Sequence, residues 1–372
     1  MKVLYSCLSK SWGGMEMYTL TSVKQLLLNN IEVEILCIKG STLDNEAKLS
    51  SIITHSISSD SYFNPTGIFR IMQILNKENF DLIHTQASRD LWLLVPALKL
   101  AGSKIPLVFT KQVGSFVVKR DLLHKIIYKR VSLAFAISEV IKKNMIDTTP
   151  LLPEKIRLLY NCIDINKFNP ANARRMEIRN EFSVDKSDLL IGMMARFSPG
   201  KGHEEFLGAA KMLKDTYNNL KFMIVGKASY GEEDYEREIK DLAAKSGLTN
   251  VIFTGFRKDT SDVLSAMDIF VFPSHAEAFG IALIEAMAME LPTVSANADG
   301  VLDITVDGET GYLFENKNVH DLCDKISRLI KSGGDRAKFG IAGRNRVMDK
   351  FNIEKQTAEI IEIYSSLISK EI

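Results

Sequence analysis

Short apolar, β-branched runs alternate with longer helix-period segments along this chain, and that alternation limits the possible folds more than any other feature. Because strands separated by helices pair in parallel, the pattern predicts a parallel sheet with helices on both faces. We therefore expect the first half to form one doubly wound α/β domain. Its strand candidates are Val3–Tyr5, Val33–Ile38, Leu82–His84, Leu107–Thr110 and Ala134–Ile137, and its clearest helix candidates are Met17–Leu28 and Ile68–Asn76.

A stretch rich in Pro, Asn and Asp near residues 150–170 separates this set from a second one. It holds one more strand candidate, Ile156–Tyr160, and then the run NCIDINKFNP, which is typical of a linker. The alternation then restarts, and 372 residues are enough for two domains. We expect Rossmann-like domains over 1–165 and 166–351, with a hinge near residues 161–170. The later strand candidates are Leu189–Met194, Lys221–Val225, Val251–Thr254, Ile269–Phe272 and Pro292–Ala296.

Composition excludes several classes of protein. The chain has 47 Lys and Arg residues against 46 Asp and Glu, a net charge of +1, so the basic excess of a nucleic-acid-binding protein is absent. The cysteines are scattered, which predicts reduced thiols rather than a metal or redox site. The N-terminal stretch lacks a signal-peptide pattern, and apolar stretches such as Leu91–Leu98 are too short to span a membrane. We therefore expect a cytoplasmic protein.

Three segments between a strand and a helix carry residues suited to a phosphate or nucleotide, because helix N-termini at the carboxyl edge of a parallel sheet attract anions. The first segment contains Gly13 and Gly14, and paired glycines let the backbone approach a ligand. Taken without the other two segments, a tight turn would be the preferred explanation of these glycines.

The second segment is the loop ARFSPGKG, which follows the strand candidate Leu189–Met194. Arg196 supplies a planar fork of donors, and Lys201 supplies a compact positive charge. This pair is suited to a diphosphate, and its place at a strand end is more specific than that of a solvated charge pair.

The third segment begins at Asp268 and reads DIFVFPSHAEAFGIALIEAMAMELPTVSA, which predicts a strand, a loop, a helix and a strand. Glu277 lies in the loop, and Gly280 lies near the helix start, where its backbone could meet a phosphate. Glu285 interrupts an otherwise apolar helix, and a carboxylate there is costly unless it accepts hydrogen bonds. Ribose hydroxyls are suitable donors, whereas an exposed helical glutamate is the alternative.

With these residues in place, the chain resembles the retaining glycosyltransferases of family 4, which have the GT-B architecture. The likeness covers nearly the whole chain and is densest from Ile191 to Phe314. Glu277 and Glu285 match the Glu-x7-Glu pattern of the family, and Arg196 and Lys201 match its pair at the donor diphosphate. The resemblance implies two Rossmann-like domains facing across a cleft, with the amphipathic helix over 352–372 completing the first.

The resemblance also implies a role for each matched residue. Glu277 would bind the donor sugar, Glu285 would bind the ribose, and Arg196 and Lys201 would neutralise the departing diphosphate. The catalytic residues would be Arg196, Lys201, Glu277 and His84. His84 would contact the donor sugar or the acceptor, although a hydrogen-bonded structural histidine is the alternative. The other implied donor contacts are Gly13 and Gly14, the backbone amides of Phe279, Gly280 and Ile281, and Arg257 in the loop that meets the base.

The chain departs from the family pattern at a few positions. Gln86 and Gln112 stand where the family has further histidines, and Asp299–Asp303 replaces its usual Gly-Gly-x-x-Glu. The main donor-site groups are retained, so the departures concern the acceptor and the donor sugar.

We therefore predict a retaining glycosyltransferase that moves a sugar from a nucleoside-diphosphate donor, of the UDP or GDP type, to a glycan or lipid-linked acceptor. A bacterial surface polysaccharide or lipopolysaccharide pathway is the setting that the family implies. The chain has no Asp-x-Asp motif, so we expect fixed positive groups rather than a metal ion to stabilise the leaving diphosphate. No nucleophile is evident, which favours front-face attack. The alternatives are a sugar-nucleotide epimerase or hydrolase of the same fold and a non-catalytic nucleotide-sugar-binding subunit.

The stretch over residues 117–130 is basic and amphipathic. Such a helix can lie on an anionic membrane surface, which would suit a lipid-linked acceptor and would place the protein at the inner face of the membrane. A solvated helix face is an equal alternative.

Overall fold

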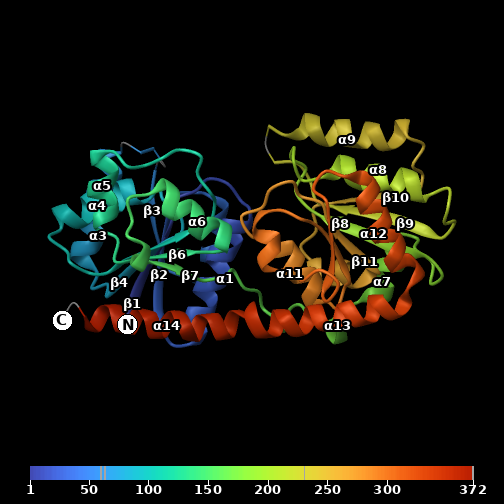
Figure 1. Cartoon of the computed structure of the whole chain (residues 1–372). Coiled ribbons are helices and arrows are strands. Elements are labelled where there is room, and N and C mark those ends of the chain that lie inside the picture. Colours follow the sequence, from blue (N-terminus) through green and yellow to red (C-terminus); the bar gives the residue numbers. More distant parts are fainter. Residues whose placement is uncertain (59–60, 63, 230, 371–372) are drawn as a thin grey trace. The chain divides into compact units, whose positions relative to one another are not determined.

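The computed structural model describes residues 1–58, 61–62, 64–229 and 231–370, and it forms two compact units (Figure 1). The first unit is Met1–Asn161 with Ile353–Ile372, and the second is Cys162–Asn352. Each unit has its own parallel sheet with helices packed against it. The predicted α/β fold with two Rossmann-like sheets is confirmed.

The sheet of the first unit runs in the order β3-β2-β1-β4-β5-β6-β7, and every pair of neighbouring strands in it is parallel. This is the doubly wound order, in which the strand order reverses beside β1. The elements of this unit are β1 (Lys2–Cys7), α1 (Gly14–Leu28), β2 (Glu32–Ile38), α2 (Thr42–Leu49), β3 (Thr54–Ile57), α3 (Pro65–Lys77), β4 (Leu82–Thr85), α4 (Leu91–Leu100), β5 (Leu107–Lys111), α5 (Leu122–Lys129), β6 (Leu133–Ala136), α6 (Glu139–Thr148), β7 (Ile156–Leu158) and α14 (Ile353–Ser369).

Helix α14 belongs to the core of the first unit although it is the last element of the chain. It contacts α1, and its apolar residues Ile360, Ile363 and Tyr364 join the core cluster around β1 and β2. The Tyr18 hydroxyl of α1 donates a hydrogen bond of 2.5 Å to Gln356 Oε1. The helical spacing of apolar residues near the C-terminus therefore buries one face of α14 against this unit.

The sheet of the second unit runs in the order β10-β9-β8-β11-β12-β13, again entirely parallel. Helices α8 and α12 contact one another, as do α11 and α13. The elements are α7 (Arg175–Glu181), β8 (Leu189–Met194), α8 (His203–Leu213), β9 (Leu220–Val225), α9 (Glu233–Lys245), β10 (Val251–Gly255), α10 (Thr260–Ala266), β11 (Ile269–Phe272), α11 (Ile281–Ala288), β12 (Thr293–Ala296), β13 (Gly311–Phe314), α12 (Val319–Lys331) and α13 (Gly333–Lys350).

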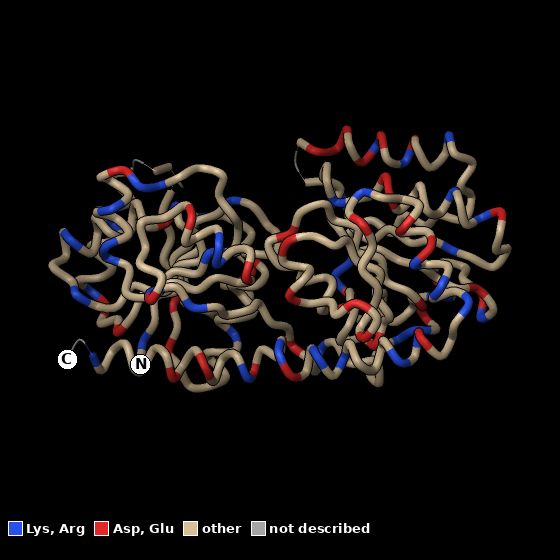
Figure 2. The backbone as a smooth tube through the Cα atoms, in the orientation of Figure 1, with Lys and Arg blue, Asp and Glu red and all other residues tan. Residues whose placement is uncertain are grey.

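Charges of both signs are interspersed along the helices, as Figure 2 shows for α9 and α14. A site for an anion must therefore be assembled from particular side chains and helix ends rather than from the net charge. Within the described residues, no helix combines the length and the apolar character that crossing a membrane requires.

Candidate functional site

Two glycines determine the backbone conformation of the loop between β8 and α8. Gly200 and Gly202 have φ of +84° and +80°, in the left-handed region that favours glycine. A Cβ at Gly202 would lie 2.2 Å from the carbonyl oxygen of Pro273, so this turn packs directly on the chain after β11. The His275 amide also donates to the Gly200 carbonyl oxygen at 2.9 Å. The turn thus brings the loop after β8 against the loop after β11.

That contact brings together Lys201 and Glu277, two residues that the sequence predicted for the site. Lys201 Nζ donates a hydrogen bond to Glu277 Oε1, and the two side chains are 24% and 20% exposed. The Gly300 amide donates to the Glu277 carbonyl oxygen at 3.0 Å, which fixes the backbone of the glutamate. A charge pair that is only partly covered remains accessible to a ligand and is worth little as a purely structural bond.

Helix α11 begins beside this pair. Its N-cap residue Gly280 has φ of +122°, where a side chain would be strained, and glycine has no side chain with which to cap the helix. The first backbone amides of a helix have no intrahelical acceptor, so the amide of Ile281 can serve an anion there. The ring of Phe279 is buried and lies 5.6 Å, centroid to centroid, from the ring of Phe351, so any ligand contact from Phe279 would come from its backbone.

Glu285 lies one turn further along α11 and is half-buried. Burial raises the pKa of its carboxyl group to about 7, and the charge of Lys167 opposes that rise. No hydrogen bond to this carboxylate occurs within the described part of the chain. A half-buried carboxylate without donors is costly, and a ligand that brings hydroxyl groups would remove that cost.

Arg196 lies on the same loop as Lys201 and is about half exposed. Its Nη1 donates to Ser229 Oγ at 3.3 Å, and its Nε lies 3.6 Å from Glu232 Oε2. Ser198 holds the other oxygen of Glu232 with a hydrogen bond of 2.5 Å. These contacts are long and therefore weak for an arginine, so moving the guanidinium toward a ligand would cost little interaction energy.

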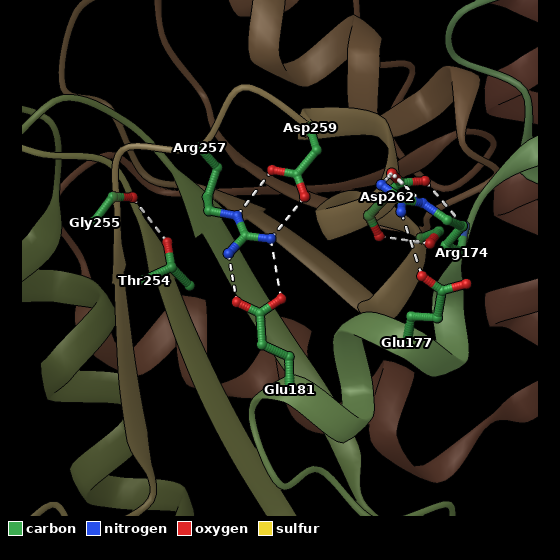
Figure 3. Close-up of polar contacts among 9 residues, drawn as sticks. Arg174, Glu177, Glu181, Thr254, Gly255, Arg257, Asp259 and Asp262 are labelled. Atoms are coloured by element: carbon green, nitrogen blue, oxygen red, sulfur yellow. Dashed lines mark hydrogen bonds and ion pairs between the residues drawn. The ribbon is translucent and has the colours of Figure 1, made fainter.

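Arg257 is engaged in an ion-pair network (Figure 3). Its Nη1 donates to Glu181 Oε1 at 2.5 Å, and its Nε and Nη2 donate to the two oxygens of Asp259 at 2.8 and 2.6 Å. The guanidinium also lies over the ring of Phe182. The hydrogen bonds that Arg257 donates to Asp259 and Glu181 raise the pKa of its guanidinium further above its usual range. The side chain ties α7 to the loop after β10, and a contact with the nucleotide base stays a prediction.

In the first unit, His84 is buried within a polar network at the end of β4. Its Nε2 lies 2.6 Å from Thr110 Oγ1, its Nδ1 forms a hydrogen bond with the Tyr364 hydroxyl, and its ring packs on Tyr5. Burial lowers the pKa of the imidazole to about 3, so the ring is neutral. Both nitrogens have partners, which favours the structural alternative, and a contact from His84 to a substrate stays a prediction.

The two glutamines that replace family histidines extend this network. Gln112 Nε2 donates to Gln86 Oε1 at 2.8 Å, Gln86 Nε2 donates to the Tyr5 hydroxyl at 2.7 Å, and Asn161 Nδ2 donates to Gln112 Oε1 at 2.9 Å. Amide side chains donate and accept at once, so they form a chain that remains uncharged.

Gly13 and Gly14 mark the start of α1. Gly14 is the first residue of the helix, and Gly13 has an extended φ of −155°, which other residues also adopt. The Gly13 amide donates to Glu16 Oε2 at 2.9 Å. This conformation does not require glycine, so close approach of a ligand stays the predicted reason for the pair.

The sequence interpretation did not single out the glutamate and histidine that brace the Lys201 turn. His275 Nε2 lies 2.8 Å from Glu205 Oε1, which ties α8 to the loop after β11. Glu205 resembles an ordinary acidic residue of a first helical turn, so only the fold reveals its partner. Within the described residues, no three His, Cys, Asp or Glu side chains gather as metal ligands would.

Two family models match the chain in succession. The model described as Glycosyltransferase Family 4 covers residues 12–167, and the model described as Glycosyl transferases group 1 covers residues 174–346. Between them they leave only the two ends and residues 168–173 unmatched. The second match contains the Lys201 turn, Glu277 and Glu285.

Curated relatives from bacteria show the same likeness. The chain is 28% identical over 253 residues to the capsular polysaccharide biosynthesis glycosyltransferase CapM of Staphylococcus aureus, which covers 67% of this chain and 65% of that protein. The chain therefore spans just under two thirds of that relative. It is 24% identical to the Escherichia coli UDP-Gal:alpha-D-GlcNAc-diphosphoundecaprenol alpha-1,3-galactosyltransferase, over 99% of this chain and 97% of that protein.

Solved structures share the fold along the whole chain. A glycosyltransferase from Rickettsia africae superposes with a TM-score of 0.89 at 23% identity, covering 99% of this chain and 98% of that chain. The HepE protein of Anabaena, in complex with UDP and glucose, superposes with a TM-score of 0.84 at 22% identity, covering 98% and 100%. At these identities the likeness carries the fold alone.

Proposed function

Because the chain belongs to the glycosyltransferases of group 1 and family 4, we propose that it transfers a sugar from a UDP-type donor to a lipid-linked glycan acceptor, with retention of configuration, in surface-polysaccharide synthesis. One observation carries this proposal. Lys201 pairs with Glu277 beside the start of α11, and Glu285, one turn further along this helix, accepts no hydrogen bond from the residues that the structure describes.

Each charged group of the second unit has a distinct proposed task. Lys201 and Arg196 would bind the diphosphate, whose negative charge grows as the bond to the sugar breaks. The amides at the start of α11 would add fixed donors without a cost of reorganisation. The leaving phosphate would accept the proton of the attacking hydroxyl on the same face, which needs no enzyme nucleophile. This assignment keeps the predicted metal-independent mechanism.

The two glutamates would hold hydroxyl groups. Glu277 is oriented by Lys201 and would accept hydrogen bonds from the donor sugar, and Glu285 would accept hydrogen bonds from the ribose. The UDP donor is supported by relatives, since the Escherichia coli enzyme uses UDP-Gal and the Anabaena protein binds UDP and glucose. The lipid-linked acceptor is supported by the diphosphoundecaprenol substrate of the same Escherichia coli enzyme.

Replacing Glu285 with Gln is expected to weaken UDP binding by roughly 10- to 100-fold, because a charge-assisted hydrogen bond contributes about 1.5–3 kcal/mol. In the unmodified protein the carboxyl group, with a pKa of about 7, must lose a proton to accept from both ribose hydroxyls. Affinity should therefore rise by about tenfold per pH unit as the pH approaches 7 from below, and level off above it. Thermal shift and calorimetric titration with UDP, at pH 5.5 to 8, measure both effects.

The matched control is Glu290→Gln, which changes an exposed carboxylate just beyond the same helix. The phosphates of UDP also titrate, so the UDP affinity of the Glu285→Gln protein should keep a weak dependence on pH. It should lack the steep rise below pH 7 that we assign to the Glu285 carboxyl group. Unchanged affinity in Glu285→Gln would remove the ribose assignment. Turnover that does not require an acceptor would favour the hydrolase or epimerase instead.

We also propose that the surface around α5 lies on an anionic membrane. On this helix Leu122, Leu123 and Ile126 are 72%, 60% and 54% exposed, whereas Ile127 and Tyr128 face the core. The basic side chains of the helix share its exposed side with these apolar residues, and that combination is typical of interfacial helices. A peripheral contact of this kind would bring the enzyme to a lipid-linked acceptor.

Vesicles that contain phosphatidylglycerol should sediment the protein at low salt, and vesicles of phosphatidylcholine alone should not. Lys125→Glu combined with Lys129→Glu should reduce binding at least tenfold, because each juxtamembrane lysine contributes about 1 kcal/mol. The control pair, Lys240→Glu with Lys245→Glu, reverses charges on α9 of the second unit. No binding at low salt would refute the membrane proposal.

A further inference from the structure

A pocket of about 380 Å³ lies wholly within the first unit, and its lining contains none of the site residues described above. Its walls come from the loop after β4, the loop after β5, and helices α4 and α5. These loops lie at the carboxyl edge of the parallel sheet, where α/β folds bind ligands. The volume is that of a site for a small organic molecule.

Aromatic rings form one side of this pocket. The centroids of Tyr62 and Trp92 lie 6.2 Å apart at an interplanar angle of 83°, and those of Trp92 and His124 lie 5.1 Å apart at 88°. His124 is further held by its hydrogen bond with Asp121 at the start of α5. Edge-to-face packing fixes the rings, and Tyr62 remains 60% exposed. Fixed aromatic surface of this kind suits the apolar face of a sugar ring.

A positive charge without an acidic partner lies on the other side. Lys119 is half-buried and donates to Ser88 Oγ at 3.3 Å, and no carboxylate pairs with it among the described residues. Burial lowers the pKa of Lys119. Burial also lowers the pKa of the nearby Lys111 to about 8, and the charge of Lys119 adds to that effect. Like charges close together in a partly desolvated place repel, so a bound anion would stabilise the charged forms of both lysines.

The hydroxyl group of Tyr128 completes the polar side. This hydroxyl is buried and makes no hydrogen bond of acceptable geometry to the described residues. Burial raises the pKa of Tyr128 to about 12, and the nearby hydroxyl of Ser88 opposes that rise, so the group stays protonated and can donate. Leaving such a group unpaired costs about 1–3 kcal/mol, which a ligand oxygen would recover.

We propose that this pocket binds the phosphate-bearing end of a lipid-linked glycosyl acceptor, with the sugar ring against Tyr62 and Trp92 and phosphate oxygens on Lys119 and Tyr128. The inference rests on the proposed transferase function and adds the place and chemistry of acceptor binding. Val117 lines the pocket and is largely exposed, and the exposed Leu122 and Leu123 follow it in the chain. The lipid chain would leave the pocket over this apolar surface, which a free sugar phosphate would not use.

Tryptophan fluorescence can report on the pocket directly. The chain has two tryptophans, Trp12 and Trp92, so Trp12→Phe leaves Trp92 as the sole reporter. Titration with geranyl diphospho-N-acetylglucosamine is expected to change its emission saturably. Lys119→Met should weaken this binding at least tenfold, because a charge-assisted hydrogen bond is lost. Lys99→Met, which removes an exposed lysine from the far end of α4, should leave the affinity unchanged.

Two further arms identify the ligand and separate this inference from the transferase function. N-acetylglucosamine 1-phosphate and geranyl diphosphate should each bind more weakly than the complete glycolipid; equal binding of the sugar phosphate would overturn the lipid-linked occupant. In turnover assays Lys119→Met should raise KM for the acceptor and leave KM for the donor unchanged. A protein that is stabilised by UDP but shows no saturable response at Trp92 would refute the pocket and leave the donor site intact.

Discussion

Replacing Lys201 with alanine is expected to lower kcat by about 100- to 1,000-fold, the cost of removing one preorganised group that stabilises developing negative charge. The Lys201 ammonium lies where the loop after β8 meets the loop after β11, and it forms an ion pair with Glu277 there. Its attraction to a diphosphate would increase as the bond between sugar and phosphate breaks. Removing it should therefore lower kcat more than it raises KM. Steady-state rates at saturating UDP-sugar and acceptor measure the change.

The matched control is Lys211→Ala, which removes an exposed lysine from α8, the helix that follows the Lys201 loop. Because Lys201→Ala also leaves Glu277 without its cation, a double-mutant cycle with Glu277→Ala is needed. We expect strong non-additivity, since the two residues act as one unit. Near-normal turnover in Lys201→Ala would contradict the assignment of this residue to the diphosphate.

Replacing Arg179 with methionine is expected to lower the free energy of unfolding of the second unit by about 3–5 kcal/mol. Arg179 is 2% exposed, and it donates to the carbonyl oxygens of Ala266, Asp185 and Asp188 at 2.9, 2.6 and 2.8 Å. It also donates to Asp268 Oδ2 at 3.2 Å. Methionine fills part of the volume but leaves these buried acceptors unpaired.

Hydrogen exchange of amides in β8 and β11 is the suitable measurement, because both tryptophans lie in the first unit and do not report on the second. The control is Lys186→Met, an exposed residue in the loop between α7 and β8. A loss below 1 kcal/mol in Arg179→Met would mean that the carbonyl groups find other donors. Arg179 carries no proposed ligand contact, so this prediction is independent of the transferase function.

The sequence pattern located the central strands well because burial on both faces makes a parallel strand a continuous apolar run. β1, β2, β8 and β11 are such runs, and the predicted ranges lie within or on the observed ones. The pattern did not indicate β3, over Thr54–Ile57, because this edge strand is short and only Ile57 is buried. An edge strand that is half exposed has no distinctive apolar signal.

The motifs predicted residues for a donor site, but they did not indicate the partners of these residues in the fold. The loop that contains Gly200, Lys201 and Gly202 can be recognised from the local sequence. Its backbone has φ above zero at both glycines, and that conformation favours glycine whatever the rest of the chain does. The approach of Lys201 to Glu277 depends on the pairing of β8 with β11, and only the folded sheet provides it. The same holds for His275 and Glu205.

The sequence by itself determined the α/β class, the two sheets and the chemical types at the predicted donor site, because apolar periodicity and glycine geometry act over a few residues. Tertiary structure alone decided which polar side chains have partners within the protein and which are left to bind a ligand. His84 and Arg257 have hydrogen-bond partners from distant parts of the chain, whereas Glu285 and Lys119 contact no opposite charge in the part of the chain that the structure describes. The reason is that the cost of a buried charge depends on its neighbours in space, and a linear motif does not contain them.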